Sequence, residues 1–250
     1  NPKRRIVVVV KMMMLGSRKL QPKARSSPRG LACFFICCRS FTTTSVNALN
    51  IAVVTGTTRT QGPPRPILGP RVASFITQSL EARGNTCTVV DPNTFELLDK
   101  PQFAYASSQV PSHLKDAHKI LEDADAYVCV TPEYNHAPSP GLLNVLNHFG
   151  SSTFSFKPSA IVSYSAGQWG GTRAAIALRP ILSELGCLPV SAMIHLPSAQ
   201  EIFDEDGKPY DDEDKWQKYT DRCFSQLEWW GTAAKKHKVE ADPFDQSPSF

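Results

Sequence analysis

The N-terminal part of the chain contains no acidic residue. The first carboxylate in the sequence is Glu81, whereas ten lysines and arginines lie before residue 48. The net charge of +4 therefore comes from one end of the chain, and acidic residues outnumber basic ones in the rest. A mildly acidic body argues against nucleic acid as the main partner.

Residues 1–47 also lack an apolar run long enough for a membrane helix. The stretches IVVVV and LACFFICC are far shorter than the ~20 residues that such a helix needs, so we predict no membrane span. A segment rich in Arg, Ser and Thr and without acid is typical of an organellar presequence. We expect a basic extension over 1–47 that is presequence-like or disordered, and the alternative is a basic arm that binds membranes or nucleic acid.

The sequence has seven cysteines but no Cys-x-x-Cys pair. Three of them cluster without a histidine at ligand spacing, which argues against zinc: Cys33, Cys37 and Cys38. The other four stand singly in apolar surroundings: Cys87, Cys129, Cys187 and Cys223. This pattern predicts reduced thiols packed in the core of an intracellular protein, and we expect no metal site.

From residue 49 onward the sequence alternates regularly between two patterns. Apolar, largely β-branched runs predict buried strands over 49–56, 86–91, 126–131, 159–165 and 188–196. Helical periodicity predicts helices over 72–82, 111–123, 139–149, 172–185 and 211–236. Strands that alternate with helices predict an α/β fold with a doubly wound parallel sheet. Five strands suit the flavodoxin-like order 2-1-3-4-5, in a domain over 48–236 that is followed by a tail over 237–250.

Ligands of such sheets bind at the carboxyl ends of the strands, around the switch point between strands 1 and 3. The loop after strand 1, GTTRTQGPPRPILGPR (residues 56–71), joins a glycine, hydroxyls and arginines to a helix N-terminus. These features favour an anion such as phosphate. The loop matches neither the Walker motif nor the GxGxxG fingerprint, and its alternative interpretation is a solvated basic loop.

The loop after strand 3 is TPEYNHAPSPG, residues 131–141. Its prolines restrict the backbone, and Tyr134 and Asn135 suit a planar heteroaromatic ring. Glu133 is a conceivable general base, but the sequence offers no adjacent nucleophile or paired acid, so we expect a positioning role. His136 either contacts substrate or is merely solvated.

The loop after strand 4 is SYSAGQWGGT, residues 163–172. Its glycines let the backbone approach a ligand closely, and Trp169 offers a stacking surface. Elsewhere, the Trp229-Trp230 pair either packs in a core or dimer contact, or marks the surface of an interaction module.

The three loops, in order, resemble those of the NADPH-dependent FMN reductase family, which includes chromate, quinone and azo-dye reductases. The resemblance covers about residues 49–200 and rests on GTTR, on TPEYNHAPSPGLLNVLNH and on KPSAIVSYSAGQWGGTRAAIALRPILSELG. It implies FMN and NADPH as cofactors, a homodimer or homotetramer, and a cytoplasmic location. The mitochondrion is the alternative if the extension is a native presequence.

The resemblance also implies roles for individual residues. The FMN phosphate would be held by Thr57, Thr58 and Arg59, with Arg65 and Arg71 as weaker candidates. The ribityl chain and flavin ring would be lined by Pro132, Glu133, Tyr134 and Asn135. The other side of the site would be closed by Ser165, Ala166, Gly167 and Gln168. Substrate would meet Trp169 and His136.

The expected activity is an FMN-dependent NAD(P)H oxidoreductase. Hydride would pass from NADPH through flavin N5 to quinone, azo, metal-oxyanion or flavin acceptors, and no side chain is expected to be catalytic because the flavin carries the chemistry. The alternative is an FMN-binding electron carrier or redox-sensing interaction protein that does not turn over NADPH.

Overall fold

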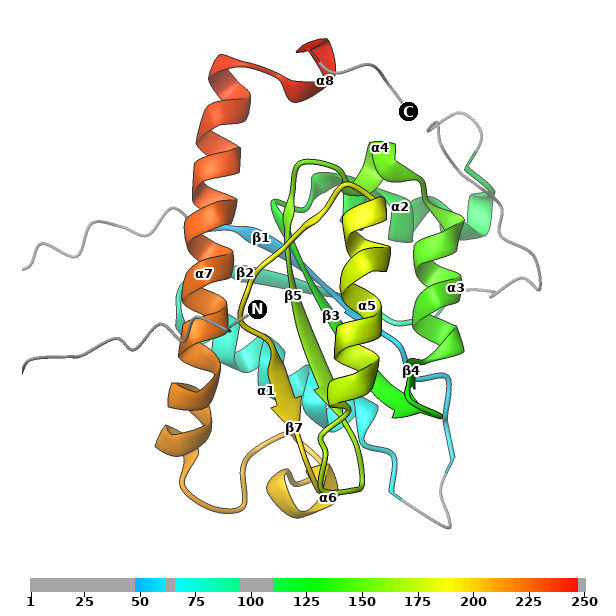
Figure 1. Ribbon diagram of the computed structural model, residues 1–250, viewed down its shortest axis with the longest axis vertical. Helices are drawn as coiled ribbons and strands as arrows, with labels where there is room; N and C mark the ends of the chain where they lie inside the picture. Colours follow the sequence, from blue (N-terminus) through cyan, green and yellow to red (C-terminus); the bar gives the residue numbers. More distant parts are fainter. Residues whose placement is uncertain (1–47, 62–65, 95–109, 247–250) are drawn as a thin grey trace, which may run out of the picture. The chain divides into compact units, whose positions relative to one another are not determined.

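The computed structural model describes residues 48–61, 66–94 and 110–246 (Figure 1). The expectations for the extension over 1–47, for Arg65 and for the three clustered cysteines fall outside these ranges. The division of the chain into extension, domain and tail stays a prediction. In the ranges that the structure describes, no helix combines the length and the apolarity that crossing a membrane requires.

In the described residues a mixed sheet of seven strands forms the centre of the fold, and five of them follow the order β2-β1-β3-β5-β6. Its main strands are β1 (Asn50–Thr55), β2 (Thr86–Val90), β3 (Ala126–Tyr134) and β5 (Pro158–Tyr164). Two short strands, β6 (Leu188–Pro189) and β7 (Ile194–Leu196), both pair with β5 in parallel, and β4 (Ala137–Pro138) pairs with β3 in antiparallel. The predicted α/β, flavodoxin-like class is confirmed, whereas the predicted number of five strands is wrong.

The expected fifth strand is divided because side chains from two helices replace part of its ladder. The Arg179 guanidinium donates to the carbonyls of Pro189 at 3.2 Å and of Val190 at 2.8 Å. The Gln226 amide oxygen accepts the N–H of Ala192 at 2.9 Å. Pro189 itself has no N–H to give to a ladder, so the run separates into β6 and β7.

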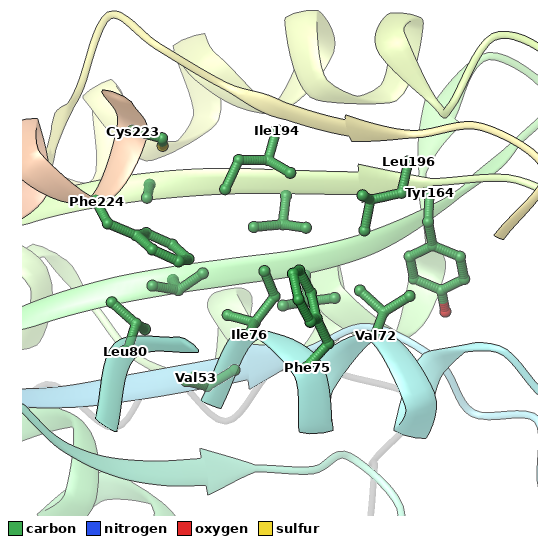
Figure 2. Packing of buried hydrophobic residues seen from close by; sticks show 14 of the residues in the cluster. Val53, Val72, Phe75, Ile76, Leu80, Tyr164, Ile194, Leu196, Cys223 and Phe224 are labelled. Carbon is green, nitrogen blue, oxygen red and sulfur yellow. The ribbon is translucent and has the colours of Figure 1, made fainter. Parts of the chain in front are cut away.

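Helices cover both faces of the sheet (Figure 1). On one face α1 (Gly69–Ala82) and α7 (Glu213–Glu240) pack against the strands, and Figure 2 shows their side chains meeting Val53 and Ile194. On the other face lie α2 (Lys115–Asp123), α3 (Pro140–His148) and α5 (Thr172–Glu184). Four short helices complete the described part of the fold: η2 (Ser112–Leu114), α4 (Ser151–Phe154), α6 (Ala199–Ile202) and α8 (Pro243–Gln246).

Alternation along the strands explains this arrangement, since successive side chains point to opposite faces. Val53 belongs to the cluster with α1 and α7, and its neighbour Val54 to the cluster with α2, α3 and α5. Helix α7 continues to Glu240 rather than ending at residue 236. Trp229 and Trp230 on this helix are exposed, so the interpretation that they pack in the core is wrong.

Candidate functional site

A cavity of about 220 Å³ lies at the carboxyl ends of β1, β3 and β5, where the strand order places the switch point. All three predicted loops contribute to it. Its lining consists of Thr57, Arg59, Pro66, Ile67, Leu68, Pro132, Glu133, Tyr134, Tyr164, Ser165, Ala166 and Gly167. The fold therefore brings together most of the residues that the sequence singled out, although they come from segments far apart in the chain.

Five of the predicted residues are not part of this lining: Thr58, Asn135, His136, Gln168 and Trp169. All five are exposed. The weaker phosphate candidate Arg71 turns elsewhere, because its guanidinium donates to the Phe203 carbonyl at 3.0 Å and pairs with Glu205 at 3.6 Å. Of the two candidate arginines that the structure describes, Arg59 is the one at the cavity.

The first loop brings a buried hydroxyl and a guanidinium to the amino end of α1. Thr57 is buried, its Oγ1 accepts the N–H of Arg59 at 3.3 Å, and its carbonyl accepts the Asn93 amide at 2.9 Å. Among the described residues no side chain caps the amino end of α1. The first N–H groups of a helix have no partner within the helix, and the helix dipole is positive there. This corner of the cavity is therefore suited to an anion.

Gly69 brings α1 close to the first loop. A Cβ at this position would overlap the methyl group of Thr57 and lie 2.9 Å from the hydroxyl oxygen of Tyr164. Only a residue without a side chain lets the helix start directly beside Thr57.

The segment TPEY forms the end of β3 rather than a loop, so the expectation that this strand ends near residue 131 is wrong. Thr131 and Pro132 pair with Ser163 and Tyr164 of β5, whereas β1 already ends opposite Val130. At Thr131 and Pro132 β3 therefore pairs with β5 alone, and β4 pairs with it only from Glu133 onward. A proline is tolerated there because no neighbouring strand needs its N–H.

Asn135 and His136 form the two-residue turn of a β-hairpin between β3 and β4. Tyr134 pairs with Ala137 across this turn, and the φ angles of Asn135 and His136 are 51° and 64°. Positive φ at both central residues is typical of a type I′ turn, in which asparagine is favoured. The structure thus gives both residues a conformational role on an exposed hairpin.

Ser139, a residue that no sequence motif singled out, connects the second loop to the first. Its side chain is buried, caps α3 by accepting the N–H of Leu142 at 3.3 Å, and donates to the carbonyl of Gly56 at 2.5 Å. Its own N–H donates to Thr131 Oγ1 at 3.0 Å. A serine directly before the proline of a first helical turn is a capping signal that indicates the first of these contacts.

Glu133 ties the second loop to the third. Its Oε2 accepts the backbone N–H groups of Arg173 at 3.1 Å and Ala174 at 3.3 Å, and its Oε1 lies 3.4 Å from the Arg173 guanidinium. These N–H groups belong to the first turn of α5, whose own N-cap residue Gly171 offers no side chain. Both carboxylate oxygens are therefore engaged in holding the amino end of α5.

The third loop is fastened from the side of β7 and α6. The carbonyls of Ser165, Ala166 and Gly167 accept from Ala199, Gln200 and Ser198, respectively. Gly170 and Gly171 have φ angles of 60° and 76°, which few other residues adopt. Trp169 is 60% exposed, with the Arg173 guanidinium 5.6 Å from its ring centroid.

Tyr164 is a second residue at the site that no sequence motif singled out. It ends β5, is buried, and lines the cavity between the first and third loops. Burial raises the pKa of Tyr164 above its ordinary value and the nearby Tyr134 adds to this, while Thr57 and Arg59 oppose it. The phenol therefore stays protonated and acts as a neutral donor at physiological pH. A tyrosine inside an apolar run carries no sequence signal that separates it from core residues.

Residues 49–201 match the family model described as NADPH-dependent FMN reductase. An NAD(P)H-dependent FMN reductase of Pseudomonas aeruginosa is 37% identical over 106 residues, which cover 41% of this chain and 57% of that protein. A quinone reductase of Pseudomonas putida is 28% identical over 165 residues, which cover 64% of this chain and 83% of that protein. The chain thus spans less than two thirds of the P. aeruginosa protein.

A solved structure with a similar fold is that of FerB, a flavoenzyme NAD(P)H:(acceptor) oxidoreductase from Paracoccus denitrificans. It superimposes with a TM-score of 0.59 at 19% sequence identity, over 74% of this chain and 98% of that one. At this identity the likeness shows the fold alone. The family model, by contrast, covers more than half of the sequence and includes all three loops. The chain therefore belongs to the NADPH-dependent FMN reductase family.

Proposed function

We propose that the chain is an FMN-dependent NAD(P)H oxidoreductase that passes hydride from NADPH to quinone, azo, metal-oxyanion or flavin acceptors. One observation carries the proposal: the uncapped amino end of α1, Arg59 and the three loops converge on one cavity at the carboxyl edge of the sheet. This is where flavodoxin-like folds bind a phosphorylated flavin, and the chain belongs to a family named for that cofactor.

The residues at the cavity fit the phosphate end of FMN. A phosphate would find three kinds of donor there: the Thr57 hydroxyl, the Arg59 guanidinium and the N–H groups that begin α1. A Cβ at Gly56 would overlap Ser139, and a Cβ at Gly69 would overlap Thr57, so the cradle depends on residues without side chains. Thr58 is exposed beside this cradle, and we keep it as a phosphate ligand.

The cavity would enclose only part of the cofactor. Its volume of about 220 Å³ lies below the ~300–1,000 Å³ of sites that bury a whole ligand. We infer that Pro132, Tyr134 and the segment 165–167 line the ribityl chain and one edge of the ring. Four of the predicted residues lie exposed beyond the cavity, where a nicotinamide or an acceptor would approach: Asn135, His136, Gln168 and Trp169.

Bound FMN would supply the redox chemistry by accepting hydride and releasing electrons to an acceptor, while the protein binds and orients the reactants. Glu133 holds the hairpin and α5 in register, and Tyr164 keeps a neutral hydroxyl between two loops. Neither side chain is needed as an acid or base in this proposal.

The test of the activity is anaerobic reduction of the FMN-loaded chain by NADPH, followed as loss of the oxidised-flavin absorbance. We expect reduction by NADPH to be faster than reduction by NADH, and reoxidation on adding a quinone. Flavin that binds but is not reduced by either nicotinamide would indicate an electron carrier. A chain that retains no FMN after soaking would exclude both functions.

Replacing Glu133 by glutamine is expected to leave flavin reduction within about tenfold of the wild-type rate. The amide oxygen of glutamine still accepts one N–H of α5, so the cost is the lost charge assistance, on the order of 1–2 kcal/mol of stability. Stopped-flow absorbance with NADPH measures the rate, and thermal unfolding measures the stability.

Arg173→Ala is the matched control for this substitution, because it removes the ion pair of 3.4 Å but leaves both backbone hydrogen bonds to Glu133. Loss of all reduction in Glu133→Gln with a normal FMN content would instead make Glu133 an acid or base of the reaction.

The assembly and the location are also proposals. We infer a homodimer or homotetramer from the family resemblance, and sedimentation velocity decides between these states. We place the protein in the cytoplasm because its described cysteines are unpaired thiols, which is the state that reducing compartments maintain.

A further inference from the structure

A second and larger cavity lies at the opposite end of the sheet from the candidate flavin site. It has a volume of about 760 Å³ and is bordered by the starts of β5 and β6, the end of α2, the C-terminal half of α7, and α8. Figure 1 shows these elements together at the amino ends of the strands, away from β4 and α6. Nothing in the proposed flavin chemistry uses this groove, which we call the amino-end groove.

Four large apolar side chains are exposed in the amino-end groove. All four line the groove, and each exposes more than two fifths of its surface: Phe156 (42%), Leu188 (45%), Trp230 (44%) and Phe244 (41%). The rings of Phe156 and Phe244 meet edge to face at 5.3 Å between centroids. Ligand sites are typically concave, apolar and of this volume, with a few polar groups that fix orientation.

Phe156 is held in a strained backbone conformation that presents its ring to the groove. Its φ angle is 64°, a left-handed value that is unusual for a bulky residue. Its N–H donates to the Gly186 carbonyl at 3.1 Å, and a Cβ at Gly186 would overlap the Ser155 side chain. Such strain persists only where the surroundings impose it, and it concentrates at ligand sites.

Lys157 provides a charged group in the groove that retains one unused donor. Its Nζ donates to the carbonyls of Leu121 at 3.0 Å and Glu122 at 2.8 Å, and lies 5.3 Å from the Tyr127 ring centroid. An ammonium has three N–H groups, and within the described part of the chain no acceptor takes the third. No described carboxylate lies within ion-pair distance of it.

A second ammonium on the groove, Lys238, also has no described carboxylate partner and lies 5.9 Å from the Phe244 ring centroid. The other basic groups of the lining are compensated: Lys235 pairs with Asp125 at 2.7 Å, and His237 lies 3.8 Å from Glu240. The lining also contains three carboxylates: Asp125 pairs with Lys235, Asp123 pairs with Lys119, and Glu122 has no ion pair among the described residues. Apolar walls and two ammonium groups without an ion-pair partner thus occur in the same groove.

We propose that the amino-end groove binds a small aromatic carboxylate, with its ring against Phe156, Trp230 and Phe244 and its carboxylate on Lys157 and Lys238. The carboxylate would accept the third N–H of Lys157, which a neutral ligand would leave buried without an acceptor. Aromatic side chains favour an aromatic body through edge-to-face and stacked contacts. This proposal is independent of the flavin chemistry.

The charge state of Lys157 supports this occupant. Burial, together with the smaller effect of the Lys238 charge, lowers the pKa of Lys157 to about 8, although Cys187, Glu122 and Asp125 oppose the shift. An anion stabilises the protonated amine. The affinity for a carboxylate should therefore be full below pH 8 and fall as the pH rises above that value, because Lys157 then loses its proton.

The test is calorimetric titration of 2-naphthoate into the full chain with saturating FMN. We expect binding that Lys157→Met weakens about tenfold or more, since a hydrogen bond to a charged group contributes on the order of 1.5–3 kcal/mol. Lys238→Met, at an exposed position, is expected to weaken it severalfold. Titration with 2-naphthylmethanol, which lacks the charge, should give weaker binding that neither substitution changes.

Lys236→Met is the matched control, because Lys236 is exposed on the same helix but does not line the groove. It should bind 2-naphthoate like the wild type. If Lys157→Met does not fold because α2 loses its carbonyl partner, Lys238→Met still provides the comparison. The proposal is overturned if 2-naphthoate does not bind, if FMN displaces it, or if the folded lysine variants bind it as tightly as the wild type.

Discussion

Replacing Gly69 by alanine is expected to reduce the affinity for FMN by roughly tenfold or more, the loss that one or two charge-assisted hydrogen bonds would cause. On intrinsic helix propensity alone the substitution should be favourable by up to about 1 kcal/mol. The added methyl group, however, would overlap Thr57 and crowd the Tyr164 hydroxyl. Thr57 or the start of α1 must then move, and both belong to the proposed phosphate cradle.

The measurement for Gly69→Ala is the dissociation constant of FMN, obtained from quenching of flavin fluorescence. Glu81→Ala, at an exposed position in the last turn of the same helix, is the control and should bind FMN normally. An FMN affinity of Gly69→Ala within twofold of the wild type would show that the cradle is not formed by the contact between α1 and Thr57.

Ser139→Ala is expected to lower the free energy of unfolding by about 2–4 kcal/mol. The loss of an N-cap costs roughly 1 kcal/mol, and a buried carbonyl left without its donor costs about 1–3 kcal/mol more. The carbonyl in question is that of Gly56, which accepts from the Ser139 hydroxyl across two loops. The substitution therefore acts on the fold and on the first loop together.

Urea denaturation measures the free energy of unfolding of Ser139→Ala, and Ser112→Ala is the control variant. Ser112 is exposed at the start of η2, and no side-chain cap is formed there, so its replacement should change stability by less than about 0.5 kcal/mol. A loss below about 1 kcal/mol for Ser139→Ala would contradict the assigned contacts.

Local patterns were sufficient to predict the main elements of the fold. The apolar, β-branched runs of β1 and β5 and the periodicity of α1 depend on neighbours that lie close in the sequence, and these elements formed where predicted to within a few residues. The end of β3 could not be predicted in the same way. Pro132 is normally a strand breaker, and it is accommodated only because β1 has already ended beside it.

The site was predicted where its residues belong to ordered motifs, and missed where it depends on contacts across the chain. The contact between Ser139 and Gly56 joins residues 83 positions apart. The interruption of the fifth strand depends on Arg179 and Gln226, which lie on different helices. Tyr164 is distinguished from a core residue only by its position at the end of β5, beside the cavity.

The contact between Glu133 and α5 has a consequence for the order in which the chain folds. The first turn of α5 has no local cap, and the group that satisfies its N–H groups lies 40 residues earlier in the sequence. A helix start that depends on a distant partner becomes stable only after the intervening strands β4 and β5 have paired. Closing this stretch of chain costs conformational entropy before the contact can form. The amino end of α5, and with it the wall of the cavity, should therefore be acquired late in folding and be lost first on partial unfolding.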